Sequence, residues 1–203
     1  SGRMPLGLAR TLGWLLLLAG VTLAWTAAAV VGRWEPGLIV LLLACCIVLY
    51  NAFLKATPAG PIVMGACRSL NVLLGMSVLT VPWQLHHGLV AGAIGVYVAG
   101  ITWFARTEAE TSRRLPLALA TAVMLGGIGL LMFLPFTDAP LVRLLELQPQ
   151  RWYVFLSALG VLIGWRFVRA VAEPSPGMVQ AAVQHGILSL IFLDAAAVYA
   201  VRD

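Results

Sequence analysis

Seven apolar stretches, each close to the length of a membrane-spanning helix, most constrain how this chain can fold. A helix needs about 20 apolar residues to cross the core of a bilayer. The stretches cover residues 12–31, 36–54, 62–82, 88–104, 115–136, 152–171 and 179–201. The breaks between them carry charge, glycine or proline, as helix ends in water do. We therefore predict an all-α polytopic transmembrane bundle of about seven helices, forming one domain over residues 1–203.

The composition excludes an ordinary soluble domain. Hydrophobic residues make up 61% of the chain and charged residues only 10%, and the mean hydropathy is +0.96. A soluble domain of this length needs far more charge to cover its surface. The formal net charge of +5 would suggest nucleic acid in a soluble chain. Here the basic residues stand between apolar stretches, so we expect a lipid bilayer as the partner and no nucleic acid.

The distribution of basic residues predicts the orientation of the bundle. If the stretches cross in alternation, eight basic residues fall on one side: Arg3, Arg10, Lys55, Arg106, Arg113, Arg114, Arg166 and Arg169. Four fall on the other side: Arg33, Arg143, Arg151 and Arg202. Cytoplasmic loops of membrane proteins carry the excess of Lys and Arg. The N-terminus is therefore predicted inside and the C-terminus outside.

The segment over residues 50–71 carries the most informative polar side chains. Arg68 lies about two turns into the third stretch, and Asn71 follows at i+3 on the same face. An arginine inside a membrane is costly unless it is paired or hydrated, so it indicates function. The alternative is an arginine that snorkels to the headgroups. Arg68, Tyr50 and Lys55 together predict a cationic inner vestibule that is suited to phosphate oxygens. The free N–H groups that begin the third helix lie close to it and also favour an anion.

Other polar residues give weaker signals. Glu108 and Glu110 stand among Thr and Ser in the loop after the fourth stretch. They could hold Mg²⁺, although the residue types alone favour an ordinary solvated loop. We expect His86 and His87 at the surface in a short outer loop, and Asp194 in an interfacial role near the outer end of the last stretch.

Three elements, in the right order, resemble the UbiA superfamily of intramembrane prenyltransferases, the 4-hydroxybenzoate polyprenyltransferase-like enzymes. The residues 1–3 (Ser-Gly-Arg) look like those that follow the first aspartate-rich motif of the family. Residues 50–61 look like its Tyr-x-x-x-x-Lys-x-Thr-Pro element, and the next helix matches at Gly65, Arg68, Asn71 and Gly75. The resemblance covers essentially the whole chain. It implies that the seven stretches are helices three to nine of a nine-helix fold, and that two helices are missing before Ser1.

The resemblance implies a function and a set of site residues. Family members bind a prenyl diphosphate through Mg²⁺ and transfer the prenyl group to an aromatic or other lipophilic acceptor, on the cytoplasmic side of the membrane. We expect a bacterial inner (plasma) membrane. The implied catalytic residues are Tyr50, Lys55 and Asn71. The implied substrate-binding residues are Arg3, Asn51, Lys55, Arg68, Asn71 and Arg106.

The chain departs from the family pattern at both metal motifs. The first aspartate-rich motif would precede Ser1, and the loop over residues 105–114 contains no aspartate where the second is expected. Glu108 and Glu110 are the possible substitutes as Mg²⁺ ligands, at a different spacing. A second hypothesis is therefore a non-catalytic relative that binds or transports a lipophilic molecule.

Overall fold

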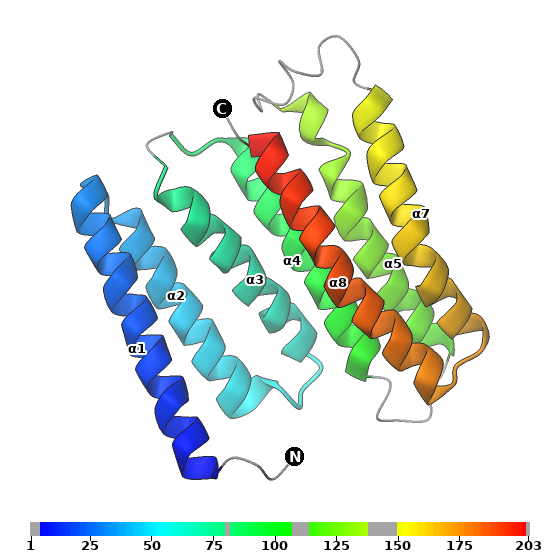
Figure 1. Ribbon diagram of the computed structural model, residues 1–203, viewed down its shortest axis with the longest axis horizontal. Coiled ribbons are helices and arrows are strands. Elements are labelled where there is room, and N and C mark those ends of the chain that lie inside the picture. The colour runs from blue at the N-terminus through cyan, green and yellow to red at the C-terminus, as the bar shows by residue number, and fades with distance from the viewer. Residues whose placement is uncertain (1–4, 80–81, 107–113, 138–149, 202–203) are drawn as a thin grey trace.

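The computed structural model describes residues 5–79, 82–106, 114–137 and 150–201. Within these ranges the chain forms seven α-helices and no strand. They are α1 (Leu6–Val31), α2 (Glu35–Leu49), α3 (Gly60–Ser77), α4 (Leu85–Arg106), α5 (Arg114–Leu131), α7 (Gln150–Ala172) and α8 (Pro176–Val201). Figure 1 shows them side by side, running alternately in opposite directions. The prediction of an all-α polytopic bundle is confirmed.

Six of the described helices are long and apolar enough to span a membrane. The exception is α3, which has 18 residues. Its hydropathy is lowered by Arg68 and Asn71, so the polar residues that indicated function also weaken its signal as a span. The predicted third stretch ran to residue 82, whereas α3 ends at Ser77. Two distorted turns extend neighbouring helices: a π-helical turn, Tyr50–Leu54, follows α2, and a 3-10 turn, Leu134–Phe136, follows α5.

The helix α4 lies at the centre of the packing, in contact with α3, α5 and α8. Its buried face includes Ile94, Tyr97 and Phe104. The hydroxyl of Tyr97 donates a hydrogen bond of 2.8 Å to the carbonyl of Gly186 on α8. Glycine brings α5 close: a Cβ added at Gly100 would lie 2.4 Å from the backbone nitrogen of Met124. In lipid, such close backbone packing replaces the hydrophobic drive for helix association.

The two ends of the bundle differ in charge. Lys55 follows the turn after α2, and Arg106 ends α4, so both lie at one end, called here the basic end. Arg114 begins α5 and Arg169 stands in the last turn of α7, at that same end. Arg33 and Arg151 lie at the opposite end. Helix alternation thus separates the basic residues as predicted, while the side of the membrane that the basic end faces stays a prediction.

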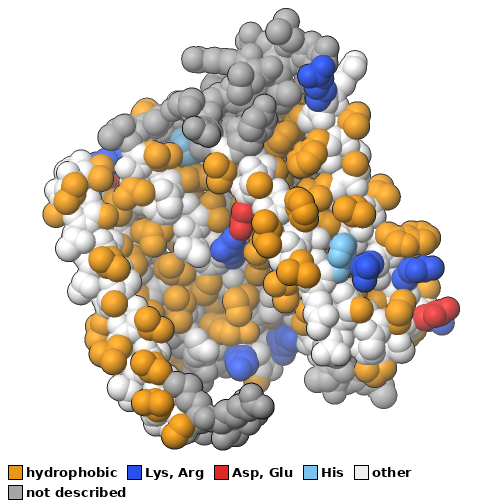
Figure 2. All heavy atoms as spheres, in the orientation of Figure 1, with side chains coloured by type: hydrophobic (Ala, Val, Ile, Leu, Met, Phe, Trp, Pro, Cys, Tyr) orange, Lys and Arg blue, Asp and Glu red, His pale blue; other side chains and the backbone are white. Residues whose placement is uncertain are grey.

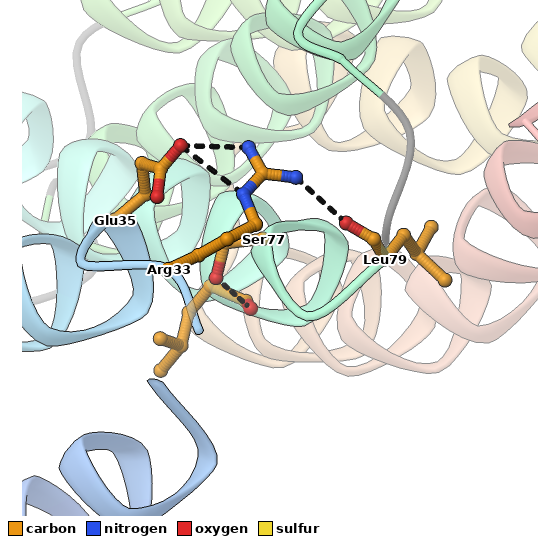
Figure 3. Close-up of polar contacts among 5 residues, drawn as sticks. Arg33, Glu35, Ser77 and Leu79 are labelled. Carbon is orange, nitrogen blue, oxygen red and sulfur yellow. Dashed lines mark hydrogen bonds and ion pairs between the residues drawn. The ribbon is translucent and has the colours of Figure 1, made fainter. Parts of the chain in front are cut away.

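At the opposite end, a group of polar contacts, called here the polar clasp, connects the turn between α1 and α2 to the residues after α3 (Figure 3). Arg33, in the turn between α1 and α2, donates to the carboxylate of Glu35 at 2.7 Å and to the carbonyl of Leu79, beyond α3, at 2.9 Å. The hydrogen bond from the guanidinium to Glu35 is the main cause that raises the pKa of Arg33. The clasp therefore ties the first hairpin to the end of α3.

Candidate functional site

The face of the molecule shown in Figure 2 is hollowed between the α1–α3 side and α8, and hydrophobic side chains occupy the hollow. Both α3 and α8 pack along α4, but they make little backbone contact with each other. In Figure 1, α4 is seen between α3 and α8, partly behind α8. A hollow of this kind, in an apolar bundle, suits the hydrocarbon part of a lipid-like ligand.

An ion pair connects the two helices on either side of the hollow. A terminal nitrogen of Arg68 on α3 donates to the carboxylate of Asp194 on α8. Their side chains are 28% and 37% exposed, so the pair is neither sealed in the core nor fully open. The Nε of Arg68 is buried and has no hydrogen-bond partner among the described residues. An unsatisfied buried donor is unfavourable, so the ion pair with Asp194 leaves the guanidinium of Arg68 only partly satisfied.

The packing of α3 on α4 fixes the position of Arg68. A Cβ added at Gly65 would lie 2.5 Å from the carbonyl oxygen of Gly95, so only glycine permits this approach. One turn later, the hydroxyl of Ser69 donates to the carbonyl of Ala91 at 2.9 Å. Gly65 and Ser69 therefore occupy the face of α3 against α4. Arg68, adjacent to Ser69, is left beside that face, from where it reaches α8.

A second cationic feature lies at the basic end, in the connection between α2 and α3. Arg106 donates to the carbonyl of Thr57 and, at 3.0 Å, to the carbonyl of Ala56. The backbone N–H of Lys55 donates to the carbonyl of Tyr50 at 2.8 Å, which closes the π-helical turn. The side chain of Lys55 is exposed and makes no ion pair with the carboxylates of the described chain. The loop therefore carries one available cation, Lys55, and is anchored by a second cation, Arg106, at the end of α4.

The remaining predicted site residues lie on the same two elements or outside the described chain. Tyr50 is half-buried in the π-helical turn. Asn51 is exposed, and its side-chain amide donates to the carbonyl of Ile47 in its own helix at 2.9 Å. Asn71 is exposed on α3. Three predicted residues lie outside the described ranges: Arg3, Glu108 and Glu110.

The structure brings some of the predicted residues together and separates others. Arg106 contacts the loop that carries Lys55. Arg68 stands eight residues beyond the first residue of α3, which is about 12 Å along the helix axis. Its ion-pair partner is Asp194. The cationic vestibule predicted as one cluster is thus arranged as two features, a loop at the basic end and an ion pair further into the bundle.

The described residues do not fit a Mg²⁺ site. No group of three or more His, Cys, Asp or Glu side chains comes together in the part of the chain that the structure describes. Asp194 is already engaged by Arg68, and Glu35 by Arg33 at the opposite end. Mg²⁺ in proteins is held by carboxylates together with phosphate oxygens and water.

Two features were missed or misjudged from the sequence. The partner of Arg68 was not identified, although Asp194 is the acidic residue inside an apolar stretch and an intramembrane arginine needs a counter-charge. His86 and His87 were expected at the surface, and this was wrong, since they are 2% and 4% exposed. They begin α4, where the Nδ1 of His87 accepts a hydrogen bond of 3.1 Å from the backbone of Gln84. The packing of α4 at the centre of the bundle buries both rings.

Comparisons with protein-family models, curated proteins and solved structures found no match for this chain.

Proposed function

We propose that the protein is a UbiA-like membrane prenyltransferase. It binds a prenyl diphosphate and transfers the prenyl group to an aromatic or other lipophilic acceptor. The observation that carries the proposal is Arg68, an arginine inside the bundle with a buried, unpartnered Nε donor. It follows in sequence the loop of Lys55, which Arg106 anchors from the end of α4, and it joins α3 to α8 through its ion pair with Asp194.

This arrangement suits a ligand that is apolar at one end and anionic at the other. The isoprenoid chain lies among the hydrophobic side chains of the hollow, where leaving water favours it. Lys55 supplies a compact positive charge, and Arg68 a planar guanidinium, for the diphosphate oxygens. In the transfer, the allylic C–O bond breaks and diphosphate leaves. The acceptor forms a bond to the prenyl carbon and loses a proton. Cations placed near the leaving group stabilise the charge that develops on it.

A second candidate function is favoured by the sequence of residues 105–114, which contains no aspartate where the second metal motif is expected. It is non-catalytic binding or transport of a prenyl diphosphate or a similar lipophilic anion. Binding requires the hollow and the cations only, whereas prenyl transfer also requires strong stabilisation of the leaving diphosphate.

One experiment separates the two functions. The protein in lipid nanodiscs is mixed with radiolabelled geranylgeranyl diphosphate, with Mg²⁺ and an extract of bacterial lipids as the source of acceptor. Saturable binding, followed by release of diphosphate and a labelled lipid product, is the outcome expected for a transferase. Binding that leaves the diphosphate intact supports the second candidate. Absence of saturable binding overturns both.

A further inference from the structure

A groove on the outer surface of the bundle lies between α5 and α7, on helices that carry none of the predicted site residues. It encloses about 410 Å³ and its lining is almost wholly apolar. The groove is lined on α5 by Leu125 and Ile128, just beyond α5 by Met132, and on α7 by Gly160, Gly164 and Trp165. Val161 and Trp165, which also line it, are 71% and 59% exposed. The groove is therefore open to the hydrocarbon around the protein.

Missing side chains produce the groove. Gly129 on α5 has nothing within 4 Å of an added Cβ, and at Gly160 the nearest atom, on Ile128, is 4.0 Å away. These glycines thus leave space that a larger residue would fill. If the groove were empty, the atoms of its walls would lack dispersion contacts on that side. In a membrane, a hydrocarbon chain or another helix therefore fills it.

One positive charge stands beside the groove, toward the basic end. The guanidinium of Arg169 lies over the ring of Trp165, 5.2 Å from its centroid, while Arg166 is exposed on another face of the same helix. Both arginines fall inside the candidate span Gln150–Ala172. Neither forms an ion pair with a carboxylate of the described residues. An arginine at such a depth needs an anion or the headgroup layer to satisfy it.

We propose that this groove binds a phospholipid with an anionic headgroup. The headgroup pairs with Arg169, and one acyl chain lies along the groove between α5 and α7. Charge complementarity selects this occupant, because an anionic headgroup brings a net negative charge to Arg169, whereas the choline of a zwitterionic headgroup offsets its phosphate and an apolar helix brings no charge. Trp165 supports both parts of the site, since its ring forms a wall of the groove and carries Arg169 above it. The site does not depend on the proposed prenyltransferase function.

Quenching of Trp165 fluorescence by brominated lipid tests the proposal. The whole chain is placed in phosphatidylcholine vesicles that contain increasing mole fractions of dibrominated phosphatidylglycerol or dibrominated phosphatidylcholine. The difference between the unsubstituted protein and Trp165→Phe isolates the signal of Trp165. Because each arginine near the membrane surface contributes about a fivefold preference for anionic lipid, the dibrominated phosphatidylglycerol should reach half-maximal quenching at a several-fold lower fraction.

Two variants and one control locate the effect. Arg169→Gln should remove most of the preference, and Gly160→Leu, which fills the groove, should reduce the quenching by both lipids. Arg151→Gln, at the opposite end of α7, should leave both unchanged. Equal half-quenching by the two lipids overturns the proposal, as does a preference that survives Arg169→Gln. Quenching that falls as the protein density in the vesicle rises indicates that a second copy covers the groove, and it also overturns the lipid site.

Discussion

The guanidinium of Arg68 on α3 donates a hydrogen bond to the carboxylate of Asp194 on α8, 126 positions further along the chain. The two helices share α4 as a neighbour but make little backbone contact with each other. The ion pair is therefore a direct link between the two sides of the hollow. It also neutralises two charges that a membrane interior would otherwise disfavour.

The first prediction concerns the coupling of this pair. Arg68→Leu or Asp194→Leu alone should lower the free energy of unfolding by about 2 kcal/mol, because each leaves the opposite charge without its partner. The double variant should lose less free energy of unfolding than the sum of the two single losses. The difference should be at least about 1 kcal/mol, which is the coupling expected for residues in contact. Unfolding in mixed micelles, followed by the loss of helical circular dichroism, measures all three.

The control for this cycle is a pair that makes no contact. Arg151 lies at the start of α7, at the end of the bundle opposite the basic end. The losses in free energy of unfolding caused by Arg68→Leu and Arg151→Leu should therefore add in the double variant. Additive losses for Arg68 and Asp194 as well would show that the ion pair contributes nothing to stability.

The second prediction concerns the available cation at the basic end. Lys55→Ala should weaken the binding of geranylgeranyl diphosphate about tenfold, the effect of losing one charge-assisted contact. Its side chain is exposed, so the unfolding midpoint should stay unchanged. Competition with radiolabelled ligand in nanodiscs measures the affinity. Arg10→Ala, an exposed cation on α1 at the same end, is the matched control, and an equal loss of affinity in that variant would reduce the role of Lys55 to general surface charge.

The helices could be predicted from the sequence, while the pairing of side chains could not. Bilayer thickness fixes the length of each apolar stretch, so the stretch over residues 152–171 differs from α7 (Gln150–Ala172) by two residues at one end and one at the other. Which helix faces which depends on packing across the whole bundle. Arg68 was recognised from its cost in a membrane, whereas its partner Asp194 stands in the last helix, and no local pattern relates the two.

The end of α3 shows a second limit of the sequence pattern. The apolar stretch continues to residue 82, but the helix stops at Ser77. The hydroxyl of Ser77 turns back to the carbonyl of Leu74 at 2.7 Å, and Arg33 bonds to the carbonyl of Leu79. Hydropathy registers neither the local hydrogen bond of Ser77 nor the contact of Arg33, which comes from a distant turn.

The third prediction concerns Arg106 and the loop it anchors. Arg106→Gln should remove the hydrogen bonds to the carbonyls of Thr57 and Ala56, at a cost of about 1–2 kcal/mol for the loop. Amide hydrogen exchange should then rise over residues 55–60 and stay unchanged in α8. Arg114→Gln, an exposed arginine at the start of α5, should leave the loop as it is. Unchanged exchange in the Arg106 variant would contradict an anchoring role.

The last prediction concerns the close contact that positions Arg68. In Gly65→Ala the added Cβ would lie 2.5 Å from the carbonyl oxygen of Gly95, so α3 must move away from α4. Overpacking of this kind costs about 1–3 kcal/mol, and the shift should also weaken the pairing of Arg68 with Asp194. Gly75→Ala, on the same helix, meets nothing within 4 Å and should be neutral. Thermal unfolding in nanodiscs compares the two variants. If Gly65→Ala is as stable as Gly75→Ala, the glycine contact does not hold α3 against α4, and another interaction must position Arg68.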